Sequence, residues 1–278
     1  MPSWLKSGNS AVITGGASGI GLAAAQHYLK EGMNVLIADV DKGALDSALD
    51  SLQDHGGELR GEVCDVSDFD QLTHLKEVAY QSFSQVHCLM NNAGTSVTRA
   101  VPWEDLGGWK KQLDINLWGV IHGCQAFIPS MLESEVPVAV INTGSKQGIT
   151  NPPGGYAYNL SKAGVLAYTQ SVAYALRQIE NCPITAHMLV PGFTYSNMIA
   201  KFVPEKPVEA WTTDQVITFM VDSLEQDDFY IICPDHSTPR ELDEKRMQWN
   251  MDDIIKNRPA LSRWHPEFSA EYEAFVKA

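Results

Sequence analysis

The sequence has few basic residues for its length of 278 residues. Lys and Arg together number 20 against 34 Asp and Glu, which gives a net charge of −14 and a pI near 4.9. Nucleic-acid binding needs a basic face that neutralises phosphates, so the shortage of cations argues against a nucleic-acid partner. It does not exclude an anionic cofactor, because helix N-termini and backbone amides bind phosphate within an acidic protein.

Long apolar runs, signal sequences and paired cysteines are also absent. No uninterrupted apolar run reaches about 18 residues, so no membrane span is expected. The first ten residues lack the apolar centre of a signal peptide. The eight histidines show no ligand spacing, so no metal site is predicted. The five cysteines form no CxxC pair and are expected to be small buried hydrophobes in a reducing, cytoplasmic compartment: Cys64, Cys88, Cys124, Cys182 and Cys233.

Short β-rich runs alternate with longer helical patterns along most of the chain. Since the runs are apolar on both faces, the alternation predicts one doubly wound α/β domain, Rossmann-like, with a mostly parallel seven-stranded sheet and helices on both faces. The strands are expected at Ser10–Thr14, Asn34–Ala38, Glu62–Val66, Val86–Asn91, Val136–Thr143, Ile184–Val190 and Phe229–Cys233. Helices are expected at Ser18–Glu31, Phe69–Phe83, Trp109–Leu132, Tyr156–Ile179 and Thr213–Leu224.

A glycine-rich turn follows the first predicted strand. Gly15, Gly19 and Gly21 stand where a dinucleotide pyrophosphate would meet a helix N-terminus, and a Cβ there would block the approach of backbone to phosphate. Asp39 ends the second strand, eighteen residues after Gly21. A carboxylate at that point can bind the adenine ribose hydroxyls and repel a 2′-phosphate, which favours NAD. Lys42 nearby keeps NADP as an open alternative.

Tyr158 and Lys162 are four residues apart in a predicted helix, with Ser145 thirteen residues before the tyrosine. Residues at this spacing share one face of a helix, so an ammonium lies beside a phenol. The positive charge is expected to lower the pKa of the phenol and favour the phenolate, which can exchange a proton with an alcohol or ketone.

Together these motifs resemble the short-chain dehydrogenase/reductase family, in its shorter, non-extended branch, over about residues 8–235. The resemblance is carried by Thr14, Gly15, Gly19, Gly21, Asn91 to Gly94, Asn116, Ser145, Tyr158, Lys162, Pro191 and Gly192. It implies that Tyr158 is the general acid/base and that Ser145 binds the substrate oxygen and the phenol. Lys162 would lower the pKa of the tyrosine and bind the nicotinamide ribose, and Asn116 would hold a water that links Lys162 to solvent.

The resemblance also implies the cofactor contacts. Asp65 and Val66 would contact adenine, and Asn91 is expected to brace neighbouring strands rather than touch a ligand. Thr194 would hold the nicotinamide end, with Ser196 as the alternative. The full predicted set is Thr14, Gly15, Ser18, Gly19, Ile20, Gly21, Asp39, Asp65, Val66, Asn92, Ala93, Gly94, Tyr158, Lys162, Pro191, Gly192 and Thr194.

The segment at about residues 193–212 is expected to shape the substrate pocket. Its apolar side chains suggest an apolar or aromatic-bearing secondary alcohol or ketone: Phe193, Tyr195, Met198, Ile199, Phe202, Val203 and Trp211. The predicted substrate contacts are Ser145, Gln147, Tyr158, Phe193 and Met198. Lys146 is expected to face solvent, with contact to a polar or acidic substrate as the alternative.

The chain departs from the family after the last predicted strand, where a glycine-rich segment is replaced by a polar tail. The domain is expected to span residues 1–238 and the tail 239–278, the tail packing on the domain or on a partner subunit, or covering the substrate pocket. A homodimer or homotetramer is expected. The predicted function is an NAD(H)-dependent oxidoreductase. The alternatives are an NAD-binding epimerase or dehydratase and a non-catalytic NAD(H) sensor, which would need only the cofactor half.

Overall fold

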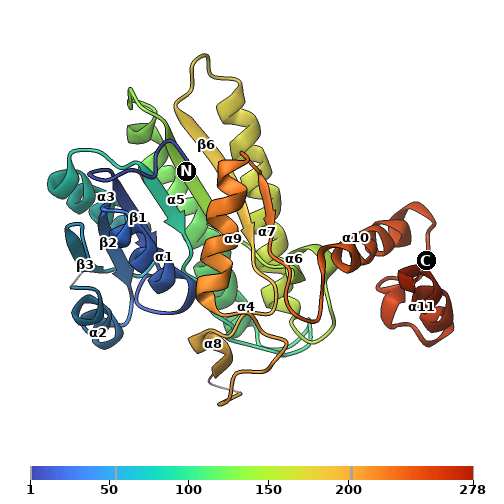
Figure 1. The fold of residues 1–278 in the computed structure, drawn as a ribbon. Coiled ribbons are helices and arrows are strands. Elements are labelled where there is room, and N and C mark those ends of the chain that lie inside the picture. The colour runs from blue at the N-terminus through green and yellow to red at the C-terminus, as the bar shows by residue number, and fades with distance from the viewer. Residues whose placement is uncertain (1, 54, 201–202, 278) are drawn as a thin grey trace.

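Seven parallel strands form one sheet in the order β3-β2-β1-β4-β5-β6-β7 in the computed structural model, which describes residues 2–53, 55–200 and 203–277 (Figure 1). The strand order reverses between β1 and β4. At such a reversal the carboxyl ends of the strands open a crevice for ligands. The strands are β1 Ser10–Thr14, β2 Asn34–Asp39, β3 Leu59–Val63, β4 Cys88–Asn91, β5 Val138–Thr143, β6 Ile184–Val190 and β7 Tyr230–Ile232.

The predicted fold class is confirmed, and the strand boundaries differ by small amounts. β1 and β6 have the predicted bounds, whereas β3 begins three residues before the predicted start, Glu62. The central strands are in parallel register. Val12 of β1 pairs with Leu36 of β2 on one side and with Leu89 of β4 on the other.

Helices cover both faces of the sheet. Successive strand residues point to opposite sides, and since both sets are apolar, each face has to be buried. Ile13 belongs to the core beneath α1, α2 and α9, whereas Val12 belongs to the core beneath α3, α5 and α7. The helices are α1 Gly19–Lys30, α2 Lys42–Leu52, α3 Phe69–Phe83, α4 Leu106–Leu113, α5 Gly119–Met131, α6 Gln147–Thr150, α7 Tyr156–Arg177, α8 Asn197–Ala200, α9 Thr213–Glu225, α10 Arg240–Ile255 and α11 Ser269–Lys277.

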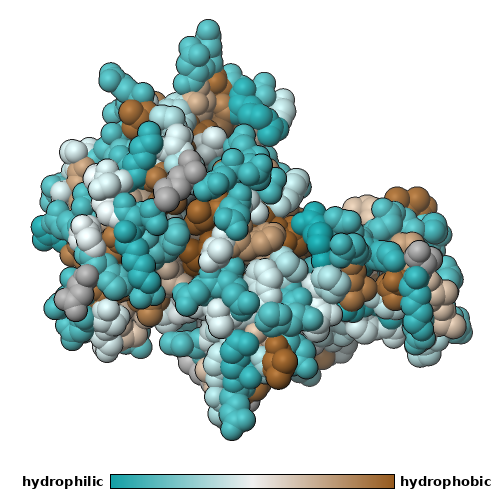
Figure 2. Space-filling model, in the orientation of Figure 1, coloured by the Kyte–Doolittle hydropathy of each residue, from teal (hydrophilic) through white to brown (hydrophobic). Residues whose placement is uncertain are grey.

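Residues 239–277 form an arm that projects from the body of the molecule (Figures 1 and 2). The arm has its own small core around Trp249, whose side chain is 2% exposed. The rings of Tyr272 and Phe275 each lie 5.3 Å from the Trp249 ring, and the Trp249 indole nitrogen donates to Ser262 Oγ at 2.8 Å. The tail aromatics therefore pack largely on one another.

Side-chain chemistry outside the core is mostly polar. Hydrophilic side chains cover most of the face seen in Figure 2.

All five cysteines are free; Cys182 is half-buried and the others are buried. Within the described ranges, no helix is both long enough and apolar enough to cross a bilayer.

Candidate active site

The glycine turn joins β1 to α1 at the carboxyl edge of the sheet. Gly15 and Gly19 have φ values of +63° and +56°, the left-handed region that favours glycine. A Cβ on Gly15 would lie 2.7 Å from the Cα of Ala93, and one on Gly21 would overlap the carbonyl oxygen of Gly15. Ser18, the N-cap residue of α1, makes no side-chain cap hydrogen bond. The turn therefore offers a backbone cradle and the helix N-terminus to an anion.

Thr14 and Asn92 hold this turn against the end of β4. Thr14 Oγ1 accepts hydrogen bonds from the backbone nitrogens of Asn92, at 3.0 Å, and Ala93, at 3.2 Å. The side-chain amide of Asn92 donates to the carbonyl oxygens of Thr14 and Gly15, both at 3.2 Å. Both side chains thus brace two segments that are far apart in the sequence. Ile20, also predicted to contact the cofactor, lies in the first turn of α1.

Asp39 ends β2 beside the same turn. Its two carboxylate oxygens accept hydrogen bonds from the backbone nitrogens of Ala17, at 3.2 Å, and Asp41, at 3.1 Å. Lys42 forms an exposed ion pair with Asp46 on α2, with 2.7 Å between Nζ and Oδ2. The carboxylate of Asp39 is therefore fixed at the turn, while the nearby lysine is engaged on its own helix.

Asp65 and Val66 follow β3 along the same edge. Asp65 Oδ1 accepts from the backbone nitrogen and the hydroxyl of Ser67, at 2.9 and 2.7 Å. Val66 is buried, and its carbonyl oxygen lies 3.0 Å from His122 Nδ1. The predicted adenine-contacting pair therefore lies at the loop after the edge strand.

Ser145, Tyr158 and Lys162 come together between the end of β5 and the start of α7. Tyr158 shares a hydrogen bond with Ser145, and Lys162 Nζ lies 5.9 Å from the centre of the Tyr158 ring. Lys162 is 3% exposed and donates to the carbonyl oxygen of Thr143 at 2.8 Å. Burial lowers the pKa of Lys162 to about 8. These positions place a hydroxyl, a phenol and a buried amine in one cluster.

The predicted direction of the Tyr158 pKa is wrong for the protein alone. Burial raises the pKa of Tyr158 because it disfavours the phenolate, and the hydrogen bond with Ser145 acts in the opposite direction without cancelling it. The Lys162 ammonium bonds to a backbone carbonyl and not to the phenol oxygen. A phenolate at neutral pH would therefore need a further positive charge beside it.

Asn116 lies in a π-helical turn, Asp114–Trp118, between α4 and α5. Its Oδ1 accepts from the Thr95 backbone nitrogen at 2.8 Å, and its Nδ2 donates to the Thr95 carbonyl at 2.9 Å and to Ser161 Oγ at 3.2 Å. A Cβ on Gly94 would lie 3.5 Å from Lys162 Nζ and 3.6 Å from Asn116 Oδ1. Asn116 therefore lies beside the lysine, as the resemblance implies. The π turn, a feature common at functional sites, was not predicted.

Asn91 braces the sheet. Its side-chain amide donates to Asn142 Oδ1 of the neighbouring β5 at 2.9 Å and to Cys124 Sγ at 3.4 Å. The predicted bracing role is confirmed.

The loop after β6 borders the cluster on another side. Pro191 and Thr194 are buried, and Thr194 Oγ1 donates to the Gly192 carbonyl at 3.1 Å. A Cβ on Gly19 would lie 3.3 Å from the Cβ of Ser196, so Ser196 is the hydroxyl residue nearer to the glycine turn.

Backbone hydrogen bonds between Trp211 and the segment Phe193–Tyr195 close this loop. Phe193 is 37% exposed, Met198 is half-buried and Gln147 is exposed at the start of α6. Phe202 lies outside the described residues.

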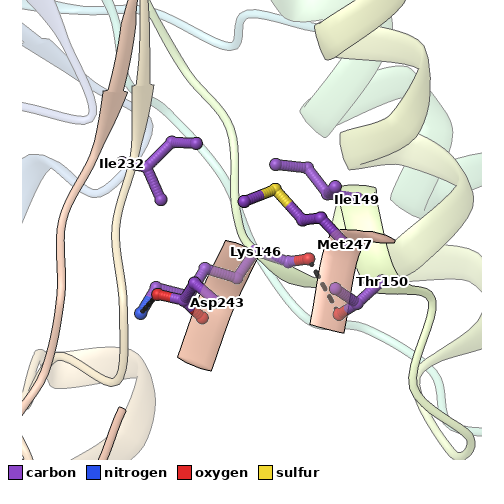
Figure 3. A pocket seen from close by; sticks show the side chains of 6 residues that line it. All are labelled: Lys146, Ile149, Thr150, Ile232, Asp243 and Met247. Atoms are coloured by element: carbon purple, nitrogen blue, oxygen red, sulfur yellow. Dashed lines mark hydrogen bonds and ion pairs between the residues drawn. The ribbon is translucent and has the colours of Figure 1, made fainter. Parts of the chain in front are cut away.

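The prediction for Lys146 is wrong. Its side chain is 16% exposed and forms ion pairs with Asp235 and Asp243, with Nζ to Oδ2 distances of 3.3 and 2.5 Å. Figure 3 shows Lys146 and Asp243 together at one side of a pocket that Ile149 and Met247 also line. The sequence carries no signal for this cluster, since its three members come from separate segments of the chain.

Known proteins match this chain over most of its length. A short chain dehydrogenase profile matches residues 9–207. The 3beta-hydroxysteroid dehydrogenase 2 of Eggerthella lenta is 32% identical over 193 residues, 69% of this chain and 73% of the relative. The 1-deoxy-11-beta-hydroxypentalenate dehydrogenase of Streptomyces avermitilis is 27% identical over 246 residues, 87% of this chain and 90% of the relative. A short chain dehydrogenase/reductase from Burkholderia phymatum, solved in complex with NAD, superposes with a TM-score of 0.83 at 27% identity, covering 93% of this chain and 97% of that one.

Proposed function

The chain belongs to the short-chain dehydrogenase/reductase family of oxidoreductases, and from that premise we propose that it interconverts a secondary alcohol and a ketone with NAD(H). The observation that carries the proposal is a cluster at the sheet edge that holds the glycine turn. In it Ser145 and Tyr158 share a hydrogen bond, and Lys162 lies beside Tyr158 and near Asn116. A cofactor-binding sensor would need the glycine turn but not this cluster.

The residues of the glycine turn suit a dinucleotide, because Gly15 and Gly19 take left-handed backbone conformations and Gly15 and Gly21 let the turn pack closely, which leaves the N-terminus of α1 without a side-chain cap for an anion. When bound, NAD would accept the hydride from the alcohol carbon. The protein must then hold the alcohol and move one proton. Ser145 would donate a hydrogen bond to the substrate oxygen, and the Tyr158 phenol oxygen would take the hydroxyl proton during oxidation and return it during reduction. The positive charges of Lys162 and of the oxidised cofactor would favour the phenolate that burial alone disfavours.

We favour NAD over NADP as the cofactor. The carboxylate of Asp39, held by two backbone amides, would bind ribose hydroxyls and repel a 2′-phosphate. Lys42, the cation that would favour NADP, is paired with Asp46. The B. phymatum structure, which contains NAD, supports the same choice.

The proposed substrate is an apolar or aromatic-bearing alcohol. Phe193 and Met198 offer partly exposed apolar surface on the loop after β6. The names of two relatives, a hydroxysteroid dehydrogenase and a hydroxypentalenate dehydrogenase, support a bulky apolar alcohol.

An absorbance screen at the NADH band tests the proposal. The purified protein is offered NAD, and in parallel NADP, with a panel of lipophilic and aromatic secondary alcohols, and a free sugar serves as the polar control. We expect NADH to form with a member of the lipophilic panel and more slowly with the sugar. Tight NADH binding without turnover of any alcohol or ketone would instead favour the sensor.

We propose in addition that the protein works as a cytoplasmic homodimer or homotetramer. Phe69 of α3 and Trp118 of the π turn are 42% and 49% exposed, and their rings lie 5.5 and 5.9 Å from that of His122 of α5, so the three elements share an aromatic surface. Exposed aromatic side chains of this kind are enriched at protein–protein interfaces. Light scattering coupled to size-exclusion chromatography would measure the mass, and a monomer at micromolar concentration would contradict this proposal.

A further inference from the structure

Three charged side chains form a buried cluster next to Ser145. Lys146 Nζ lies 2.5 Å from Asp243 Oδ2 and 3.3 Å from Asp235 Oδ2. The side chains of Lys146, Asp235 and Asp243 are 16%, 4% and 6% exposed. Because water reaches these groups poorly, their charges must be compensated within the protein, and the lysine and the two carboxylates compensate one another.

Asp235 connects this cluster to the loop after β6. The oxygen that faces Lys146, Oδ2, also accepts a hydrogen bond from the backbone nitrogen of Phe193 at 3.0 Å. A Cβ on Gly192 would lie 2.9 Å from that oxygen and 3.0 Å from Lys146 Nζ. The other oxygen accepts from the Ser237 backbone nitrogen at 3.1 Å and the Ser237 hydroxyl at 2.9 Å. The backbone of the Gly192–Phe193 turn therefore lies directly against the cluster.

Lys146 connects the cluster to Ser145. The two residues are adjacent, and the Lys146 carbonyl accepts from the backbone nitrogens of Ile149 and Thr150, both at 3.0 Å, at the start of α6. Ser145 Oγ accepts from the Gln147 backbone nitrogen at 3.2 Å within the same turn. The ion pairs of the Lys146 side chain therefore anchor the short segment that carries the Ser145 hydroxyl.

Asp243 brings the C-terminal arm into the cluster. It lies in the first turn of α10, the first helix of the arm. A second contact joins the same two helices without charge, since the side-chain amide of Asn250 donates to the Ile149 carbonyl at 3.1 Å. The arm thus contacts this segment through an ion pair at Lys146, the N-cap residue of α6, and through a neutral hydrogen bond at Ile149, beside the apolar packing of Met247.

We propose that Lys146, Asp235 and Asp243 are positioning residues that fix Ser145 relative to the Gly192–Phe193 turn, and that the arm supports the active site through Asp243. The inference rests on the proposed function. It gives the C-terminal extension a part in turnover, because Asp243 supplies the closer of the two carboxylates around Lys146. Small displacements of a group that contacts the reacting oxygen lower kcat more than they change cofactor affinity.

Asp243→Asn is the direct test, using the full chain and the alcohol that the wild type oxidises fastest. The amide keeps the shape and leaves Lys146 paired with Asp235. We expect kcat to fall by about tenfold while the Kd for NADH stays within about twofold. Asn250→Ala is the matched control, since it weakens the contact between the same helices without touching the ion pair, and it should leave kcat at the wild-type value.

A double-mutant cycle separates a shared role from independent damage. If Lys146→Met and Asp243→Asn act through one interaction, the double variant should lose about as much kcat as the worse single variant, and not the product of the two losses. Should Asp243→Asn fail to fold by circular dichroism, Asp243→Glu, which keeps the charge but displaces the carboxylate, takes its place with the same expected fall in kcat.

The outcomes distinguish this inference from the proposed function. An active wild type with an unchanged kcat in a folded Asp243 variant, or an equal loss of kcat in Asn250→Ala, would overturn the positioning role alone. A wild type that binds NADH but turns over no alcohol or ketone would overturn the proposed function and this inference with it.

Discussion

The ammonium of Lys162 donates a 2.8 Å hydrogen bond to the carbonyl oxygen of Thr143, the last residue of β5. This bond ties the helix that carries Tyr158 to the central sheet. It also holds the amine away from solvent, and burial lowers the pKa of Lys162 to about 8 from its usual 10.5. The fold therefore carries a buried cation that weakens its stability at neutral pH.

The stability of the protein should consequently rise with pH relative to Lys162→Met. Between about pH 8 and pH 10.5 the unfolded chain holds a proton on Lys162 that the folded protein has released, so the free energy of unfolding increases with pH in this window. The expected gain of the wild type over the variant is about 3 kcal/mol from neutral pH to the top of the window. Urea denaturation of both proteins at several pH values measures it.

Because both proteins share every other titrating group, their difference isolates the lysine. If the difference in the free energy of unfolding between the wild type and Lys162→Met stays constant or falls as the pH rises, the lowered pKa of Lys162 is contradicted. NADH should raise the free energy of unfolding of the wild type at every pH, by an amount that grows with the logarithm of the free NADH concentration once it exceeds the Kd.

Gly15→Ala should both destabilise the protein and abolish cofactor binding. The φ of +63° strains any side chain, and the new Cβ would lie 2.7 Å from the backbone of Ala93. We expect a loss of about 2 kcal/mol in the free energy of unfolding. Gly107→Ala is the control, because nothing lies within 4 Å of its added Cβ. Denaturation and NADH fluorescence titration would check both variants. Equal stability and equal NADH affinity of the two would contradict the role of Gly15 in the cofactor-binding turn.

Asp39→Ala should narrow the preference for NAD over NADP. Removal of the carboxylate takes away the repulsion of a 2′-phosphate. The ratio of kcat/KM with NAD to kcat/KM with NADP should therefore fall by about tenfold, equivalent to about 1.4 kcal/mol. Asp41→Asn removes a neighbouring charge and keeps the cap that the Asp41 side chain provides to Ala44, so its ratio should stay near the wild-type value. A wild type that already prefers NADP would contradict the assignment of the cofactor.

The fold was predictable from the sequence because its signals are local. A short apolar run such as Ile184–Val190 predicts a strand covered on both faces, and the structure buries six of its seven residues. The glycine turn and the spacing of Tyr158 and Lys162 likewise depend on neighbours in the sequence. Helix α2 was not predicted, although its buried residues Leu45, Ala48 and Leu52 have the spacing of an amphipathic helix.

Features set by tertiary contacts could not be predicted in this way. The predicted helix Trp109–Leu132 contains a π turn at Asn116, whose side chain bonds to Thr95 and Ser161. Lysine is a residue type that usually faces solvent, so the sequence predicts a surface position for Lys146. Only folding brings it to carboxylates about ninety residues further along the chain. The pKa of Tyr158 rises through burial, which helix spacing does not reveal.

The most direct test of the proposed chemistry is a comparison of kcat in the wild type, Tyr158→Phe and Tyr156→Phe. Loss of the phenol oxygen of Tyr158 removes the general acid/base, so kcat should fall by about a hundredfold to ten-thousandfold while the Kd for NADH stays within about twofold. Tyr156 begins the same helix and has Leu160, not a lysine, four residues on, so Tyr156→Phe should keep nearly full activity. Retention of most of the activity by Tyr158→Phe would contradict the account.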